Sequence, residues 1–253
     1  GIKGAYSHMA SEECFPKGIK IPCVSFEEML DKTKTGLADY AMVPVENSVA
    51  GRVADIHNLI PESGLFIIAE HFQKVNHQLL GLKGASFNQI KYVKSHAQGI
   101  AQCRNLIKKL KLKPIQHIDT AGAAYEVANE NDISVAAIAS KMAGEIYGLK
   151  VLKKNIADAS HNTTRFLIMS SKMLVPNIKI KKTVTSIIFE VKSVPAALYK
   201  VLGGFATNGI NLTKLESYLG GKNMYSAKFF VDAESHPNSV QMKNALDEMK
   251  FYT

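Results

Sequence analysis

Short apolar runs alternate with amphipathic stretches from the start of the chain to about residue 153. Runs rich in aliphatic and aromatic residues predict strands at residues 19–24, 40–45, 65–69, 90–93, 115–118 and 134–137. Apolar residues at helical spacing predict a helix over residues 97–110, and further helices at 121–129 and 140–147. Strands that alternate with helices are typical of a mostly parallel, helix-covered sheet, which binds ligands at the carboxyl ends of its strands.

Three local signals predict where helices begin and end. Ser25 and Glu28 form a capping box that opens one helix. Asp119 or Thr120 can cap the helix over residues 121–129. Gly148 suits the left-handed end of the helix over residues 140–147.

A polar connection at residues 170–182, which contains Pro176, separates this region from one with a different pattern. Strands are predicted at 184–191, 210–219 and 224–231, with a turn at 220–221 and helices at 196–207 and 240–249. This β-α-β-β-α order is one strand short of the split βαβ fold. We therefore expect two domains, at residues 1–176 and 183–253, with the last strand of the second missing. The chain also begins on what looks like a strand-to-helix turn without its strand.

Composition narrows the classes of protein that fit. The chain has 253 residues, 46% hydrophobic and 21% charged, and its longest apolar runs are far shorter than a membrane span. The net charge is +9, but the lysines are scattered and lack interleaved aromatic residues, which argues against nucleic-acid binding. The three cysteines do not fit a disulfide framework or a metal site, so we expect a cytoplasmic protein without membrane or nucleic-acid partners.

Two polar clusters in the first part of the chain are candidates for a ligand site. Tyr6 and Ser7 follow a glycine at a predicted helix start, where free N–H groups attract anions, although a plain helix cap explains them as well. Glu46, Asn47 and Ser48 follow an apolar strand directly, and polar residues there often face a cleft. The alternative is a turn in which these side chains bond their own backbone.

Two further clusters follow in the same region. Ser95 can cap the helix over residues 97–110 while His96, with Gln98 nearby, faces the cleft, unless this histidine is structural. Thr164 and Arg165 precede an apolar strand. The planar fork of an arginine suits a carboxylate, and the hydroxyl can donate to a leaving oxygen, whereas a simple strand start is the alternative.

Several sequence motifs of cofactor-dependent enzymes are absent. The chain has no glycine-rich phosphate loop, no dinucleotide fingerprint, no zinc-ligand spacing and no serine nucleophile elbow. Any chemistry is therefore expected to need no cofactor and no metal.

Together the clusters resemble the prephenate dehydratase family, and the order and spacing agree over nearly the whole chain. The matching segments are 46–48, 95–96 through 102–103, 119–121 and 162–166. The resemblance implies two similar α/β lobes with a cleft, like type II periplasmic binding proteins, and gives Thr164 the central catalytic role. It implies substrate contacts from residues of all four clusters and from the helix start at Thr120, namely Arg165, Phe166, Glu46, Asn47, Ser48, Ser95, His96, Gln98, Thr120, Tyr6 and Ser7.

The C-terminal region resembles the ACT domain of this family, an α+β ferredoxin-like (βαββαβ) fold that binds phenylalanine. The residues implied in that binding are Ala196, Ala197, Leu198, Asn211, Leu212, Glu216 and Ser217. Two of its segments depart from the family pattern. Ala196 stands where glycine is common, and Tyr218 and Leu219 follow Ser217 where Arg-Pro is common.

The resemblance implies that prephenate is converted to phenylpyruvate in phenylalanine biosynthesis, under feedback control by phenylalanine. It also implies a homo-oligomer, either a dimer or a tetramer. Two alternatives remain open from the sequence: a two-lobed binding or sensor module with an ACT domain, and arogenate as the preferred substrate.

Overall fold

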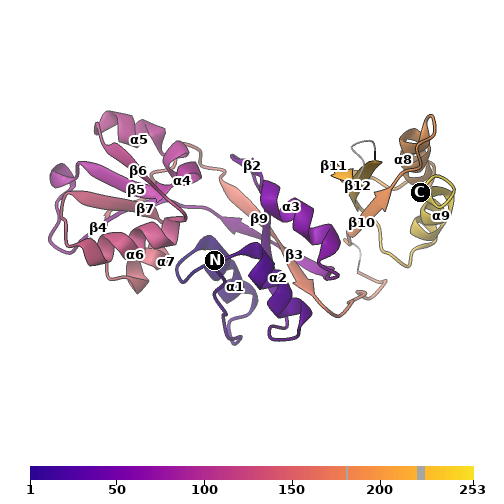
Figure 1. Ribbon diagram of the computed structural model, residues 1–253, viewed down its shortest axis with the longest axis horizontal. Coiled ribbons are helices and arrows are strands. Elements are labelled where there is room, and N and C mark those ends of the chain that lie inside the picture. Colours follow the sequence, from indigo (N-terminus) through magenta and orange to yellow (C-terminus); the bar gives the residue numbers. More distant parts are fainter. Residues whose placement is uncertain (181, 221–225) are drawn as a thin grey trace. The chain divides into compact units, whose positions relative to one another are not determined.

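A computed structural model describes residues 1–180, 182–220 and 226–253, which form two compact units, Gly1–Lys172 and Met173–Thr253 (Figure 1). No helix within these described ranges is long and apolar enough to cross a bilayer. Each unit has its own sheets and its own hydrophobic core. The first unit contains two sheets, and we call the halves built on them lobe I and lobe II.

Lobe I is a sheet of four strands in the order β2-β1-β9-β3 with helices on both faces (Figure 1). Its elements are α1 (Tyr6–Cys14), α2 (Phe26–Lys34), β1 (Ala41–Asn47), β2 (Gly51–Arg52), α3 (Ala54–Leu59), η1 (Ile60–Glu62), β3 (Phe66–Lys74) and β9 (Thr163–Ser170). Alternate residues of β9 face opposite sides, so Phe166 packs against α1 and Leu167 packs with α2 and α3. Both faces of the sheet are thereby buried.

Lobe II is a sheet of five strands in the order β6-β5-β7-β4-β8. Its elements are β4 (Gln78–Gly81), η2 (Phe87–Gln89), β5 (Tyr92–His96), α4 (Ala97–Ala101), α5 (Arg104–Lys109), β6 (Lys113–His117), α6 (Thr120–Glu130), β7 (Val135–Ala139), α7 (Lys141–Ile146) and β8 (Lys150–Lys153). One core contains Leu106 from α5, and the other contains Val127 from α6 and Ala143 from α7. Asp119 caps α6, as predicted, through a 2.6 Å bond from Gly122 N–H.

The expectation of a mostly parallel sheet is wrong for lobe I. Every strand pair there is antiparallel, whereas β5 pairs with both β6 and β7 in parallel in lobe II. The physical reason is that β9 enters lobe I only after the chain has built lobe II. This late strand pairs between β1 and β3, and a local pattern cannot reveal such a return.

The predicted strand at residues 19–24 is also wrong. The chain is irregular between α1 and α2, and Ile19 and Val24 are 93% and 94% exposed. The run is apolar enough for a strand, but no described strand lies beside it to complete a ladder. Apolar character alone therefore misidentified this segment.

The helix predicted over residues 97–110 is interrupted between α4 and α5. The backbone N–H of Asp158 donates to the Gln102 carbonyl at 2.7 Å, and the Asp158 carboxylate accepts from Asn105 N–H at 3.2 Å. A distant residue thus ends one helix and begins the next. The break places the Gln102 side chain beside the segments that connect the lobes.

Two segments cross between the lobes, at residues 75–77 and 154–162. They are bonded to each other, because Val75 N–H donates to the Asn162 carbonyl and Ile156 N–H donates to the His77 carbonyl, both at 2.9 Å. His77 and Asn162 are 2% and 1% exposed. The connection is therefore a paired and buried structure.

The second unit is a sheet of three strands in the order β10-β12-β11 with two helices. Its elements are β10 (Thr185–Glu190), α8 (Ala197–Thr207), β11 (Leu212–Gly220), β12 (Ser226–Ala233) and α9 (Val240–Met249). The antiparallel pairs and their order agree with the β-α-β-β-α prediction. Gly221 of the expected turn and Met224 of the expected strand lie outside the described residues, as do the side chains of Tyr218 and Leu219.

Ala196 precedes α8 with φ 62° and ψ 14°, in the left-handed region. The helix therefore begins at Ala197, one residue later than predicted, and Pro195 lies before the cap. An L-residue with a Cβ costs roughly 1–2 kcal/mol in this conformation, whereas glycine adopts it freely. The position thus carries strain that glycine would remove.

We predict that Ala196→Gly stabilises the second unit by about 0.5–1 kcal/mol, since relief of strain exceeds the added flexibility of the unfolded chain. Ala206→Gly, at an exposed position inside α8, is the matched control and should destabilise it by about 0.5–1 kcal/mol. Urea denaturation measures both. Equal losses of stability in the two variants would show that the left-handed conformation is not adopted.

Candidate active site

A β-bulge in β1 determines which side chain lies opposite Thr164. The pairing of β1 with β9 shifts by one residue between Pro44 and Glu46. Beyond the shift, Glu46 lies opposite Arg165 and Asn47 lies opposite Thr164. Without the extra residue, the alternation of side chains would bring Glu46 to Thr164. The bulge therefore gives Thr164 an amide as its neighbour instead of a carboxylate.

The turn after β1 fixes the orientation of the Asn47 side chain. The backbone N–H groups of Val49 and Ala50 donate to Asn47 Oδ1 at 3.0 and 2.8 Å. Two donors require an oxygen on this side, so the amide nitrogen must point the other way. There Asn47 Nδ2 donates to Thr164 Oγ1 at 3.0 Å and to Asn162 Oδ1 at 2.7 Å.

The same reasoning fixes the next two amides. Asn162 Oδ1 accepts from Asn47, so Asn162 Nδ2 donates to Gln102 Oε1, at 2.9 Å. Gln102 Nε2 in turn reaches Asn47 Oδ1 at 3.4 Å. A lost partner for the buried Asn162 would cost roughly 1–3 kcal/mol. Asn47, Asn162 and Gln102 therefore form a closed set of directed hydrogen bonds, which we call the amide ring.

His77 connects the amide ring to α1. Its Nε2 lies 2.8 Å from Gln102 Oε1, and its Nδ1 lies 3.1 Å from the Tyr6 hydroxyl. An amide oxygen can only accept, so Nε2 carries the hydrogen and Nδ1 of the neutral ring accepts from Tyr6. Burial lowers the pKa of His77, although the bond to Gln102 raises it in part. Burial also raises the pKa of Tyr6, so its hydroxyl keeps the proton that it donates.

The hydroxyl of Thr164 accepts from Asn47, and this decides what its hydrogen can do. A hydroxyl has one hydrogen to donate. Among the described residues, no acceptor lies within hydrogen-bonding distance of that hydrogen. Thr164 is therefore oriented by the protein as an acceptor and left able to donate to a ligand.

Arg165 is held between two carboxylates. Its Nε and Nη2 both lie 2.7 Å from Glu70 Oε2, and its Nη1 lies 2.9 Å from Glu46 Oε1. The Arg165 side chain is 13% exposed. The sequence led us to expect substrate contacts from Arg165 and Glu46, but here the two bind each other, on the face of β9 opposite Thr164. A substrate carboxylate would have to displace one of these partners.

Two other predicted contact residues have structural partners. Ser48 Oγ donates to the His161 carbonyl at 2.8 Å and accepts from Thr163 N–H at 3.0 Å, which ties the β1 turn to the start of β9. Phe166 is 2% exposed and packs in the lobe I core with Ala10. The ring of Phe166 therefore faces the core, and this position does not support the expected contact with substrate.

In lobe II, the predicted residues gather at the carboxyl ends of β5 and β6. His96, and not Ser95 as expected, caps α4, because its Nδ1 accepts from Gln98 N–H at 3.2 Å. Ser95 is 0% exposed, and its hydroxyl donates to the Ile138 carbonyl of β7 at 2.7 Å. The expectation failed because β5 extends through His96, which turns Ser95 into the sheet. Thr120, in the first turn of α6, is half-buried.

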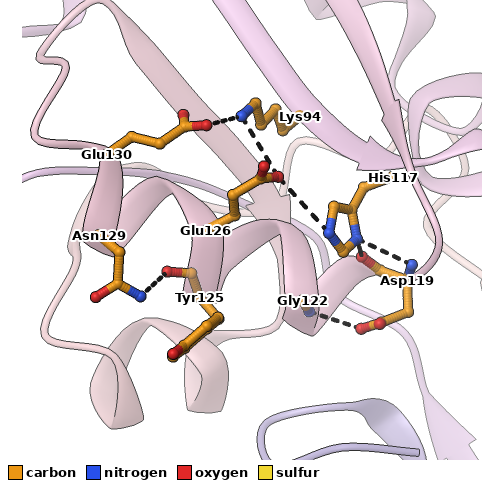
Figure 2. A network of polar contacts seen from close by, with 8 residues as sticks. All are labelled: Lys94, His117, Asp119, Gly122, Tyr125, Glu126, Asn129 and Glu130. Atoms are coloured by element: carbon orange, nitrogen blue, oxygen red, sulfur yellow. Dashed lines mark hydrogen bonds and ion pairs between the residues drawn. The ribbon is translucent and has the colours of Figure 1, made fainter. Parts of the chain in front are cut away.

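Ion pairs on β5 and β6 hold the helix that carries Thr120 (Figure 2). Lys94 of β5 pairs with Glu130 and, at 3.4 Å, with Glu126, both on α6. His117 Nε2 lies 3.6 Å from the same Glu126 carboxylate. Burial lowers the pKa of Lys94, but the two carboxylates outweigh burial and raise it overall. A charged Lys94 therefore fixes α6 against β5.

Tyr6 and Ser7 are neighbours in α1 but face different surroundings. Tyr6 reaches His77 and also lines a cavity of about 530 Å³ with Asn76 and Gln78. Ser7 lines another cavity, of about 430 Å³, with residues that include Ile19. The structure therefore brings Tyr6, but not Ser7, into the network around Thr164.

The seven residues expected to bind phenylalanine lie in the second unit at the start of α8 and along β11. They are Ala196, Ala197, Leu198, Asn211, Leu212, Glu216 and Ser217. Leu198 and Leu212 pack against the same core. Asn211 Nδ2 donates to Glu234 at 2.6 Å, and Glu216 pairs with Lys214 at 3.3 Å.

Sequence reasoning missed His77 as a site residue and treated Gln102 and Asn162 only as parts of motifs. His77 lies in a polar triplet, 76–78, between two apolar strands. A polar interruption between strands is a usable signal for a connection that carries function. The sequence could not show that the triplet meets Tyr6 on one side and Gln102 on the other.

Comparison with known proteins places this arrangement in a family. The sequence model of the prephenate dehydratase family matches residues 1–174. A bifunctional N-acyl-homoserine lactone acylase/prephenate dehydratase of Komagataeibacter europaeus is 42% identical over 253 residues, covering 100% of this chain and 90% of the relative. Arogenate dehydratase/prephenate dehydratase 1 of Arabidopsis thaliana is 37% identical over 264 residues, covering 99% of this chain and 67% of the relative.

A solved structure shows the same fold. The prephenate dehydratase of Arthrobacter aurescens in complex with L-Phe superposes with a TM-score of 0.90 at 26% identity, over 100% of this chain and 85% of that one. The two-lobed α/β fold is therefore confirmed. A purely binding or sensory module is not favoured, because the family match spans both lobes. The chain belongs to the prephenate dehydratase family, whose members are carbon–oxygen lyases.

Proposed function

We propose that this protein converts prephenate to phenylpyruvate by decarboxylating dehydration, with Thr164 as the catalytic residue. Prephenate carries two carboxylates and a ring hydroxyl. One carboxylate leaves as CO2, and the electron pair of that C–C bond forms the aromatic ring as the C–O bond to the hydroxyl breaks. The hydroxide takes up one proton and leaves as water, so the reaction needs no oxidant or reductant.

The observation that carries this proposal is the state of the Thr164 hydroxyl. It accepts from Asn47 at 3.0 Å, so its hydrogen is directed away from the protein network. A donor held in place before the reaction stabilises the negative charge that develops on the leaving oxygen. The amide ring sets the orientation of the Thr164 hydroxyl. It places no charged group there that could compete with the substrate carboxylates.

We expect Thr164→Ala to lower kcat by about 100- to 1,000-fold, the usual effect of removing one oxyanion donor. Thr164→Ser keeps the hydroxyl and should lose much less. Thr163→Ala is the matched control, since that side chain faces the other side of β9 and donates only weakly, at 3.4 Å, to the His161 carbonyl. The measurement is phenylpyruvate formation from prephenate, and wild-type turnover in Thr164→Ala would refute the assignment.

The choice between prephenate and arogenate is part of the proposal. Arogenate has an amine where prephenate has a carbonyl, and the name of the Arabidopsis relative covers both substrates. We place prephenate first, because the motifs of this chain resemble those of the prephenate dehydratase family. Assays of the purified protein with each substrate decide the order, and a parallel assay of N-acyl-homoserine lactone hydrolysis tests the other activity in the name of the Komagataeibacter relative.

The domain roles also belong to this proposal. Residues 1–176 form the dehydratase domain and residues 183–253 form an ACT domain that binds phenylalanine. The enzyme works in the cytoplasm as a dimer or tetramer, with pairs of ACT domains forming the regulatory sites. The start of α8 suits the carboxylate of an amino acid, because its first N–H groups have no helical partner. The Arthrobacter aurescens structure with bound L-Phe supports this regulation.

We predict that phenylalanine binds and weakens the apparent affinity for prephenate by about 5- to 150-fold, which corresponds to a coupling of about 1–3 kcal/mol. Calorimetry and kinetics with phenylalanine test this, with tyrosine as the control for side-chain selectivity. Light scattering on the same sample gives the oligomeric state. If neither amino acid binds, the second unit is an assembly module and not a sensor.

A further inference from the structure

His77 is buried at the crossing between the lobes and does not contact Thr164. Its ring joins two elements that are distant in sequence, namely α1, through Tyr6, and the end of α4, through Gln102. Only 2% of the residue is exposed. Its influence on a reaction must therefore pass through the groups that it bonds.

Only one tautomer of His77 is compatible with the direction of the amide ring. With the hydrogen on Nε2, Gln102 Oε1 accepts from both His77 and Asn162. With the hydrogen on Nδ1, two lone pairs would face each other at 2.8 Å. To avoid this repulsion, the Gln102 amide would have to rotate. The Gln102 oxygen would then face Asn47 Oδ1, which already accepts from two backbone N–H groups.

Such a rotation would also remove the acceptor of Asn162 Nδ2, a group on a residue that is 1% exposed. The N–H groups of Val49 and Ala50 keep the direction of the Asn47 amide, but two oxygens facing each other would push Asn47 away from Gln102 and shift the donor that orients Thr164. A tyrosine hydroxyl can donate or accept, so the Gln102 oxygen selects the Nε2–H tautomer and Tyr6 then donates to Nδ1. Burial keeps both groups neutral.

We propose that His77 is a positioning residue: as the Nε2–H tautomer it donates to Gln102 and holds the amide ring in place, so that the Thr164 hydroxyl faces the substrate. The inference rests on the proposed dehydratase function and deepens it. It assigns a role to the histidine between the lobes and a role to Tyr6 that differs from direct substrate contact.

Two amide variants distinguish a positioning role of His77 from a role in packing alone, because each replaces one ring nitrogen. In His77→Gln the amide nitrogen can take the place of Nε2 and donate to Gln102. In His77→Asn the amide oxygen can take the place of Nδ1 and accept from Tyr6, but nothing reaches Gln102. We expect His77→Asn to lower kcat by about 10- to 100-fold with KM nearly unchanged, and His77→Gln to recover much of that loss.

His236 provides the matched control. It is 7% exposed in the second unit, its Nδ1 accepts from Asn238 N–H at 3.0 Å, and its Nε2 lies 2.9 Å from the Pro176 carbonyl. It is thus a buried histidine with the same tautomer but outside the network. His236→Asn and His236→Gln should both keep wild-type kcat on prephenate.

Nitrogen NMR of the full-length protein reads the tautomer without substrate. The expected result is hydrogen on Nε2 of His77 in the wild type and also in Tyr6→Phe, because the Gln102 oxygen selects this tautomer. Hydrogen on Nδ1 in the wild type, or equal turnover of folded His77→Asn and His77→Gln, would overturn the inference. A wild-type protein that does not turn over prephenate would instead refute the proposed function. The NMR measurement would still test the tautomer of His77 independently.

Discussion

One side chain, Asn47, joins a turn to the hydroxyl of Thr164, the proposed catalytic group. Its oxygen is occupied by two backbone N–H groups, and its nitrogen therefore has a fixed direction. Because this nitrogen donates to Thr164, the hydroxyl accepts from the protein and keeps its hydrogen for a ligand. A rigid neutral dipole of this kind orients the donor without placing charge beside an anionic substrate.

The site is complete only when both lobes contribute. Asn47 and Thr164 belong to lobe I, Gln102 follows the first helix of lobe II, and Asn162 lies on a segment that crosses between them. The polar groups that connect the lobes are therefore the same groups that orient the hydroxyl of Thr164. Movement of one lobe against the other would change the amide ring, so the fold couples lobe arrangement to the state of Thr164.

The lobed fold and most element positions could be predicted from the sequence, because periodicity and motif order are local, and the role of Thr164 stays a prediction. The sequence could not predict the bulge that moves Glu46 away from Thr164, or the break at Gln102 that Asp158 imposes, since both depend on strands and loops that meet only after folding. The strand predicted at residues 19–24 is wrong for the same reason, as no strand among the described residues lies beside it. Ala196 was recognised as a departure, but its left-handed conformation required the structure.

The most direct test of the central claim is the turnover of Asn47→Asp on prephenate. Aspartate keeps the oxygen that accepts from Val49 and Ala50, so the turn should fold as before. The second oxygen cannot donate, and it would instead accept the Thr164 hydrogen and hold it away from the substrate. The account predicts a loss in kcat of about 100-fold or more with a folded protein. Wild-type kcat in this variant would contradict it.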